Sequence, residues 1–235
     1  MKTYTQTQTF KLFTFNELSA DAQERAEENY LNNEGVLWMK NDLFQEWAKD
    51  YAEELGGGLF NVNEVLYSLR YCQGDGVEIG GTIDALAYLK QHETELKREF
   101  FELHGQRFKN VDALTDGDVK TISNTLEEFG TGYIIEVFEH YGSPYARKRL
   151  TAVSELSWRL GTTEETNERD VLRLLDILES SILCFYEEIT NELKKAGYEW
   201  FYNLDESDYE SLEEYYYTED GEEFGRIEDI DGEAE

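Results

Sequence analysis

Between residues 205 and 224, acidic side chains and tyrosines are interleaved in a pattern that suits the binding of positively charged groups. A tyrosine ring receives an arginine side chain by a cation–π contact, and neighbouring carboxylates can pair the same guanidinium through two parallel hydrogen bonds. Residues 205–235 hold 15 acidic side chains and one basic one, Arg226, which gives a net charge of −14. We predict that the partner-binding residues of this segment are Asp205, Glu206, Asp208, Tyr209, Glu210, Glu213, Glu214, Tyr215, Tyr216, Tyr217, Glu219, Asp220, Glu222 and Glu223.

A second group of acids lies near the N-terminus, in and directly after the first predicted helix. It consists of Glu24, Glu27, Glu28 and Glu34. Acidic side chains at helical spacing form one charged face. We predict that this face is a second partner-binding patch.

The whole chain is strongly acidic, with 52 Asp and Glu against 21 Lys and Arg and a net charge of −31 in 235 residues. Duplex DNA carries one charge per roughly 1.7 Å of its axis, so 31 charges match the phosphates of about 15 base pairs. Such a surface repels nucleic acid and anionic membranes and attracts basic nucleic-acid-binding proteins. Acidity also serves solubility alone, and this second interpretation stays open.

Catalytic signatures are few in this sequence. Cys72 and Asp75 lie in the string Tyr71-Cys72-Gln73-Gly74-Asp75-Gly76, where a thiol or an acid between glycines suits nucleophilic chemistry. No histidine lies nearby, however, and Asp-Gly is the ordinary signature of a tight turn. The chain has no P-loop, GxGxxG or GxSxG motif, and its three histidines lack metal-ligand spacing. We therefore predict no enzyme, no cofactor and no metal site; a hydrolase using Asp75 or an acidic metal cluster is the enzymatic alternative.

The elements that must position the acidic side chains are predicted from hydrophobic periodicity. Strands are expected near 3–15, 59–72, 77–82 and 132–139, and helices near 19–33, 36–55, 84–105 and 163–196. The last of these helices should end at Gly197, because glycine favours the residue after a helix. The predicted fold class is α+β, a mostly antiparallel sheet covered by about four helices, with an acidic C-terminal extension.

The composition of the chain shifts near residue 205, and no Gly/Ser/Pro-rich linker precedes that point. We predict a globular α+β domain over residues 1–204, followed by an acidic, Tyr-rich segment over 205–235. This segment should form a short helix and a hairpin around Asp220-Gly221, with disorder beyond Arg226. The N-terminus lacks an apolar leader and no stretch is long and apolar enough to span a bilayer, so a cytoplasmic location is expected.

Three short islands of sequence carry a resemblance. They are Phe15-Asn16-Glu17-Leu18-Ser19, Tyr71-Cys72-Gln73-Gly74-Asp75-Gly76 and Tyr217-Thr218-Glu219-Asp220-Gly221-Glu222-Glu223-Phe224. These strings resemble those of small acidic proteins encoded by phages and prophages. The resemblance implies a phage setting, in which an acidic protein without catalytic motifs is similar in character to inhibitors of host defence, including DNA-mimicking anti-restriction and anti-CRISPR proteins.

The sequence thus predicts a phage-encoded DNA mimic that occupies the basic nucleic-acid-binding surface of a host defence nuclease or its complex. The alternative is a protein-interaction module that bridges or blocks a host complex through an aromatic or helical surface, with acidity incidental. A homodimer is compatible with both the DNA mimic and the protein-interaction module. Salt separates the two functions, because electrostatic docking weakens steeply with ionic strength and apolar docking does not.

Overall fold

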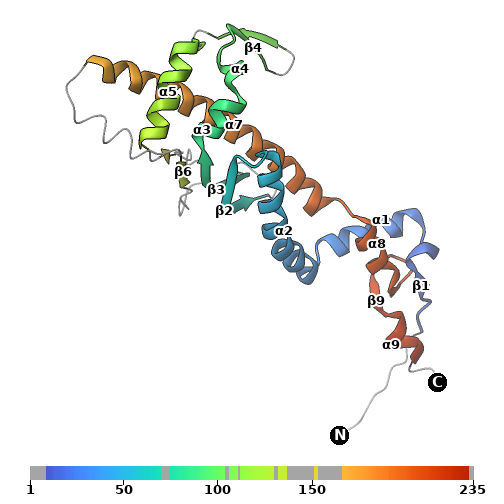
Figure 1. The fold of residues 1–235 in the computed structure, drawn as a ribbon. Coiled ribbons are helices and arrows are strands. Elements are labelled where there is room, and N and C mark those ends of the chain that lie inside the picture. The colour runs from blue at the N-terminus through green and yellow to red at the C-terminus, as the bar shows by residue number, and fades with distance from the viewer. Residues whose placement is uncertain are drawn as a thin grey trace. The chain divides into compact units, whose positions relative to one another are not determined.

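The computed structural model describes residues 9–69, 75–103, 106–110, 112–129, 132–136, 151–152 and 166–232, and it is an α+β protein (Figure 1). The chain divides into two compact units. Unit 1 consists of Met1–Phe44 and Tyr198–Glu235, and unit 2 consists of Gln45–Gly197. The two ends of the chain therefore belong to the same unit, and the helices α2 and α7 each contribute residues to both.

Unit 1 is built around a three-stranded antiparallel sheet in the order β1–β8–β9. Phe13 of β1 is opposite Tyr217 of β8, and Tyr215 of β8 is opposite Arg226 of β9. The elements are β1 (Phe13–Thr14), the 3-10 helix η1 (Phe15–Glu17), α1 (Ala20–Leu31), the first half of α2 (Glu34–Leu55), the end of α7 (Thr166–Tyr202), α8 (Glu206–Glu213), β8 (Tyr215–Tyr217), β9 (Glu223–Arg226) and α9 (Ile227–Gly232).

The core of unit 1 joins the two ends of the sequence. Ala22 and Ala26 lie one helical turn apart on α1, and they are buried together with Phe15, Leu18, Leu212 and Tyr217. Small side chains on α1 allow the β8–β9 turn to approach the helix backbone closely. At Gly221, where φ is +83°, a Cβ atom would overlap the carbonyl oxygen of Ala22. Only glycine satisfies both the left-handed backbone and this close approach.

A buried ion pair connects four helices of unit 1. The Lys40 ammonium lies 2.9 Å from Oδ2 of Asp208, and both side chains are more than nine-tenths buried. The same ammonium donates to the backbone carbonyls of Trp200 and Asn203, so its three protons are all used. Asp208 in turn accepts from the Tyr30 hydroxyl. The pair therefore fixes α2, α8, α1 and the end of α7 to one another.

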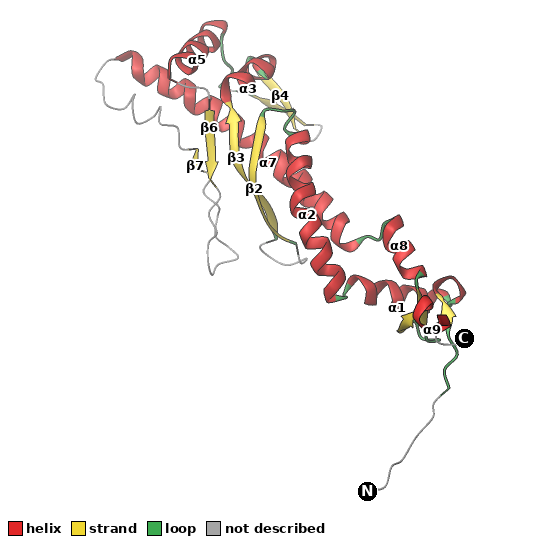
Figure 2. Cartoon of the chain, turned by 60° about the horizontal axis from the view of Figure 1, so that its bottom comes forward, coloured by secondary structure: helices red, strands yellow, loops and turns green. Residues whose placement is uncertain are grey.

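Unit 2 contains a four-stranded antiparallel sheet in the order β2–β3–β6–β7 (Figure 2). Tyr186 of α7 contacts this sheet, because its hydroxyl donates to Glu78 and accepts from the backbone N–H of Ile79. The elements are β2 (Phe60–Ser68), β3 (Gly76–Asp84), α3 (Ala85–Gln91), α4 (Glu93–Leu96), a hairpin of β4 (Phe100–Leu103) and β5 (Gln106–Lys109), α5 (Asp116–Phe129), β6 (Gly132–Glu136) and β7 (Thr151–Ala152).

The predicted α+β class is confirmed. The structure also confirms the first two helices and the C-terminal hairpin, and, over their described residues, the strands near 59–72, 77–82 and 132–139. The helix predicted over 84–105 is wrong beyond its first turns. Asp84 caps α3 by accepting from two backbone N–H groups, but α3 ends at Gln91 and α4 at Leu96. Phe100 and Phe101 then enter a strand, because they pair with the strand at Gln106–Lys109.

Three further predictions at element ends are corrected. The long helix does not end at Gly197 but continues to Tyr202. Within 9–15, only Phe13–Thr14 is in a strand, and residues 1–8 lie outside the described part of the chain. The stretch beyond Arg226, expected to be disordered, forms α9 over Ile227–Gly232. The acidic residues 205–232 belong to the same compact unit as the N-terminal segment. The helix α5, over Asp116–Phe129, is not among the predicted helices.

Replacing Gly221 with alanine should lower the free energy of unfolding by about 2 kcal/mol or more, because the methyl group adds a clash with the Ala22 carbonyl to the cost of a left-handed backbone. The matched control is Gly58→Ala. Gly58 also has a positive φ, of +76°, but nothing lies within 4 Å of its Cβ position, so we expect about 1 kcal/mol. Chemical denaturation measures both; equal losses would contradict the close approach of the hairpin to α1.

Replacing Lys40 with methionine should cost about 3 kcal/mol, because the buried Asp208 carboxylate loses its counter-ion. The control is Lys11→Met, since Lys11 is an exposed lysine of the same unit, and this change should shift stability by less than about 0.5 kcal/mol. Urea titration followed by circular dichroism measures both. A loss below about 1 kcal/mol for Lys40→Met would show that the pair does not organise unit 1.

Candidate functional site

All the residues predicted to bind a partner lie in unit 1, although the two groups are far apart in the sequence. Direct contacts join them. The Arg25 guanidinium on α1 lies 3.7 Å from the Asp220 carboxylate in the β8–β9 turn. The ring of Tyr209 on α8 lies near the ring of Phe15. The pKa of the Tyr209 hydroxyl is raised, first by desolvation and then by the Glu27 carboxylate. The fold thus places both predicted groups of acids in one unit and brings Glu27 of the first group against α8.

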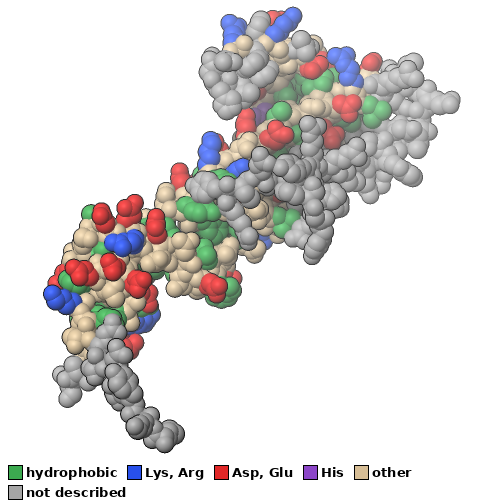
Figure 3. Space-filling view, turned by 180° about the vertical axis from the view of Figure 1, so that it is seen from behind, with side chains coloured by type: hydrophobic (Ala, Val, Ile, Leu, Met, Phe, Trp, Pro, Cys, Tyr) green, Lys and Arg blue, Asp and Glu red, His purple; other side chains and the backbone are tan. Residues whose placement is uncertain are grey.

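Unit 1 carries most of the negative charge of the protein. Its 82 residues contain 23 Asp and Glu against 5 Lys and Arg, a net charge of −18. The 153 residues of unit 2 carry −13. Figure 3 shows acidic side chains gathered over the part of the protein at its lower left, which is unit 1. The acidity is therefore concentrated, and we refer to this region as the acidic face.

Most of the predicted acids on the acidic face are exposed to solvent. The exposed ones are Asp205, Glu206, Glu210, Glu213, Glu214, Glu219, Asp220, Glu222, Glu223, Glu24, Glu28 and Glu34. Glu27, Tyr215 and Tyr216 are half-buried, and Tyr209 is exposed. These side chains are placed where a partner can reach them.

Two of the predicted contact residues have a structural role instead. Asp208 is buried in the ion pair with Lys40, and Tyr217 is 3% exposed. The Tyr217 hydroxyl donates to the backbone carbonyl of Leu212 at 2.9 Å. Burial raises the pKa of Tyr217 above the ordinary range of tyrosine, so the hydroxyl keeps its proton and remains a donor. The interleaved sequence pattern alone does not separate these inward-facing residues from their exposed neighbours.

The N-terminus of α8 fixes another acid. The Asp205 carboxylate accepts hydrogen bonds from the Ser207 hydroxyl and from the backbone N–H of Asp208, and these bonds lower its pKa. Asp205 and Asp208 form a capping box at this helix end. Asp205 therefore holds α8 in place while its charge remains at the surface.

Arg226, in unit 1, lies against a tyrosine ring and near carboxylates, which is the arrangement predicted for an arginine of a partner. The Arg226 guanidinium lies 5.6 Å from the centre of the Tyr215 ring, and its Nε donates to the Tyr215 hydroxyl. The same guanidinium approaches the carboxylates of Glu214 and Glu228. The arrangement of Tyr215 on β8 with Glu214 at the end of α8 and Glu228 on α9 thus receives a guanidinium.

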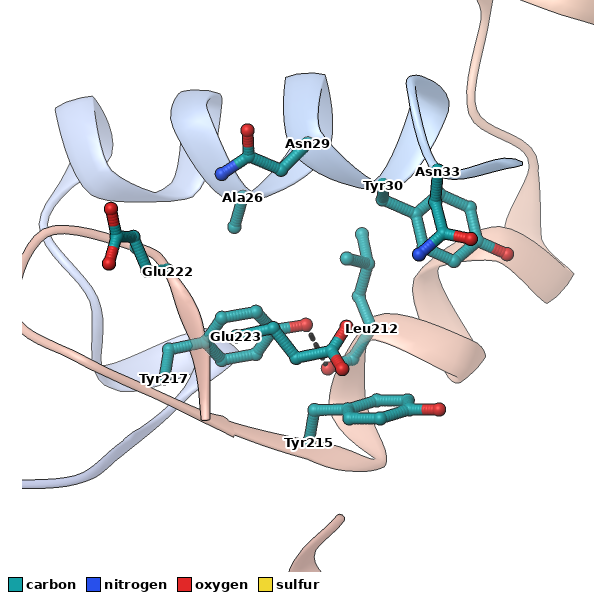
Figure 4. Close-up of a pocket in the computed structure, with 10 residues that line it drawn as sticks. Ala26, Asn29, Tyr30, Asn33, Leu212, Tyr215, Tyr217, Glu222 and Glu223 are labelled. Carbon is teal, nitrogen blue, oxygen red and sulfur yellow. Dashed lines mark hydrogen bonds between the residues drawn. The ribbon is translucent and has the colours of Figure 1, made fainter. Parts of the chain in front are cut away.

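A pocket of about 380 Å³ opens between α1 and the β8–β9 hairpin, within unit 1 (Figure 4). Leu212 and the rings of Tyr215 and Tyr217 form its apolar part, and the Glu223 side chain extends across it. The full lining is Ala26, Asn29, Tyr30, Asn33, Leu212, Tyr215, Tyr217, Gly221, Glu222 and Glu223. A planar cation with an aliphatic stem, such as an arginine side chain, matches this combination of aromatic rings, amides and carboxylates.

Sequence reasoning missed the α1 side of this pocket. Ala26, Asn29 and Tyr30 follow one another at steps of three and one residues, which places them on one side of α1, and Asn33 lies just after the end of this helix. This helical spacing could have been recognised in the sequence as a second side of the helix. The predicted acids Glu24 and Glu28 lie on the other side of α1.

The string Tyr71–Gly76, on which the enzymatic alternative depends, lies mostly outside the described residues. Cys72 and Gly74 are not described, whereas Asp75 directly precedes β3, and its backbone carbonyl accepts from the Lys194 ammonium. Among the residues that the structure describes, there is no group of three or more His, Cys, Asp or Glu that could hold a metal ion. None of the described helices combines the length and the apolar content needed to cross a membrane.

Comparisons with protein-family models, with curated proteins and with solved structures give no match for this chain. The acidic face must therefore be interpreted from its own chemistry.

Replacing Tyr217 with phenylalanine should lower the free energy of unfolding by about 1 kcal/mol, because the Leu212 carbonyl loses its donor in a buried site. Tyr216→Phe is the control on the same strand. Its hydroxyl lies 3.3 Å from the exposed Asp231 carboxylate, so its loss should change stability by less than about 0.5 kcal/mol. Denaturant titrations compare the two variants, and equal stability of both variants would place Tyr217 at the surface.

Proposed function

We propose that this protein is a phage-encoded inhibitor of a bacterial defence system, which acts as a DNA mimic in the cytoplasm of the infected host. Its acidic face occupies the basic nucleic-acid-binding surface of a defence nuclease or of the complex that contains it. The observation that carries the proposal is the concentration of a net charge of −18 on one folded unit of 82 residues.

The amount of charge suits a nucleic-acid groove. Since duplex DNA carries two phosphates per base pair, 18 charges match about nine base pairs, or roughly 30 Å of duplex. The acidic side chains come from α1, α8 and the β8–β9 hairpin, which share one core. Because these elements are folded before binding, the partner does not have to order them, and less conformational entropy is lost on association.

The mechanism needs no bond-making step. The field of the acidic face steers the basic partner toward it and accelerates association. Exposed carboxylates then pair with the lysines and arginines that otherwise hold phosphates, and the pocket beside Tyr215 can take one arginine side chain. Nucleic acid is excluded because the lysines and arginines that would bind its phosphates are already paired with carboxylates.

The phage setting rests on the three islands of sequence described above. Two of them, Phe15–Ser19 and Tyr217–Phe224, lie in unit 1. The rings of Phe15 and Tyr217 are 6.2 Å apart in an edge-on arrangement, so these islands pack on each other. This supports the view that the resembling residues build the acidic face.

The experiment that tests the proposal uses purified restriction nucleases and CRISPR effector complexes with a fluorescent duplex. We expect the protein to release the duplex from at least one of these enzymes, and excess unlabelled duplex should reverse the effect. Inhibition that excess duplex does not relieve would contradict mimicry. The absence of any effect across the panel would contradict the inhibitor function.

Neutralising three hairpin acids should weaken inhibition about tenfold at low salt, because each exposed ion pair contributes roughly 0.5 kcal/mol. The variant carries Glu219→Gln, Glu222→Gln and Glu223→Gln. The matched control makes the same charge change on exposed acids of unit 2, with Glu95→Gln, Glu127→Gln and Glu128→Gln. Dose–response curves compare the two; an equal loss of inhibition in both variants would mean that net charge matters and the acidic face does not.

A further inference from the structure

Exposed hydrophobic side chains gather in the same unit as the acids. Among the residues that the structure describes, every large hydrophobic side chain that is strongly exposed belongs to unit 1. These are Phe10, Trp38, Met39, Leu43, Tyr202, Tyr209 and Phe224. Three of them, Trp38, Met39 and Leu43, lie within six residues on α2. A concentration of this kind marks an interaction surface more often than chance exposure does.

The outward side of α2 is not needed to fold unit 1. The opposite side of the helix makes the contacts within the unit, through buried Lys40 and through Phe44, whose ring lies 5.0 Å from that of Phe201. Trp38 is 71% exposed and Leu43 is 50% exposed. These side chains present apolar area to solvent that contributes nothing to the core.

The shape of this side of α2 is set by its sequence. Trp38 and Met39 are consecutive residues of α2, and both side chains are exposed. Leu43 follows Met39 by one turn and extends the apolar strip. Such a strip of exposed apolar side chains suits the apolar side of a partner helix.

The charges beside this strip select the partner. Glu34 and Asp42 are exposed on the same stretch of α2, whereas Lys40, its only basic residue within unit 1, is buried in an ion pair. A second copy of the chain would bring another unit with a net charge of −18 against this one. A partner with apolar side chains bordered by lysine and arginine is complementary in both respects.

We infer that the Trp38–Met39–Leu43 face of α2 docks a basic amphipathic helix of the inhibited nucleic-acid-binding protein. The inference rests on the proposed function and deepens it. The acidic face supplies the salt-sensitive part of the affinity, and the α2 face supplies a salt-resistant part by burying apolar area. The complex should therefore persist at salt concentrations that release duplex DNA from the same enzyme.

The test uses the full chain and a fluorescent synthetic peptide that forms a helix with leucines on one side and lysines on the other. Anisotropy is measured from about 50 mM to about 200 mM salt. Trp38→Ala should weaken peptide binding about tenfold at every salt concentration, and the triple hairpin variant should instead reduce the dependence on salt. The control for Trp38→Ala is Phe224→Ala, an exposed aromatic on β9, which should leave binding unchanged.

The outcomes separate this inference from the proposed function. Unchanged binding by Trp38→Ala, or equal binding of a scrambled peptide with the same composition, would overturn the docking site while leaving DNA mimicry in place. Binding that ignores salt and the hairpin acids, yet still needs Trp38, would overturn mimicry and keep the docking site. A dimer in sedimentation that Trp38→Ala dissociates, without peptide binding, would assign the face to a second copy of this chain and overturn the inference.

Discussion

The buried pair of Lys40 and Asp208 is the interaction on which the rest of unit 1 depends. Two charges removed from water are tolerated only when each finds its partners, and here the ammonium uses all three protons on one carboxylate and two carbonyls. Asp208 also accepts from Tyr30, so the pair joins α1, α2, α8 and the end of α7. Because α8 leads directly into the β8–β9 hairpin, the pair also holds the acidic face in place. One buried cation thus organises a unit that is otherwise dominated by repulsion.

That repulsion explains how the surface is arranged. Mutual repulsion among the 23 acids of unit 1 opposes compaction. Several of these acids are held by hydrogen bonds or ion pairs within the unit. Asp205 caps α8, Glu213 accepts from Asn16, and Asp220 faces Arg25. The other exposed acids stay at the surface of a folded scaffold. The proposed mimicry would use these fixed carboxylates to bind a basic partner, and solubility remains the alternative role.

Local signals in the sequence predicted some elements of unit 1. Hydrophobic periodicity predicted a helix near 19–33, where α1 lies, and Asp220-Gly221 predicted the hairpin. Signals that depend on distant partners failed. Glycine inside a helix costs about 1 kcal/mol, but packing of Trp200 and Phe201 on Phe44 carries α7 past Gly197. Beyond Arg226, Ile230 packs beside Gly225 and orders α9. The pocket needs α1 and the hairpin together, and no local pattern reports that pairing.

The central claim is that the acidic face competes with nucleic acid for a basic host surface. The most direct test is capture of host proteins on the immobilised full chain at low salt, followed by elution in salt steps and identification by mass spectrometry. We expect a nucleic-acid enzyme that duplex DNA displaces and that the chain with the neutralised hairpin captures poorly. Capture of only proteins without affinity for nucleic acid, in amounts that duplex DNA and salt leave unchanged, would contradict the claim.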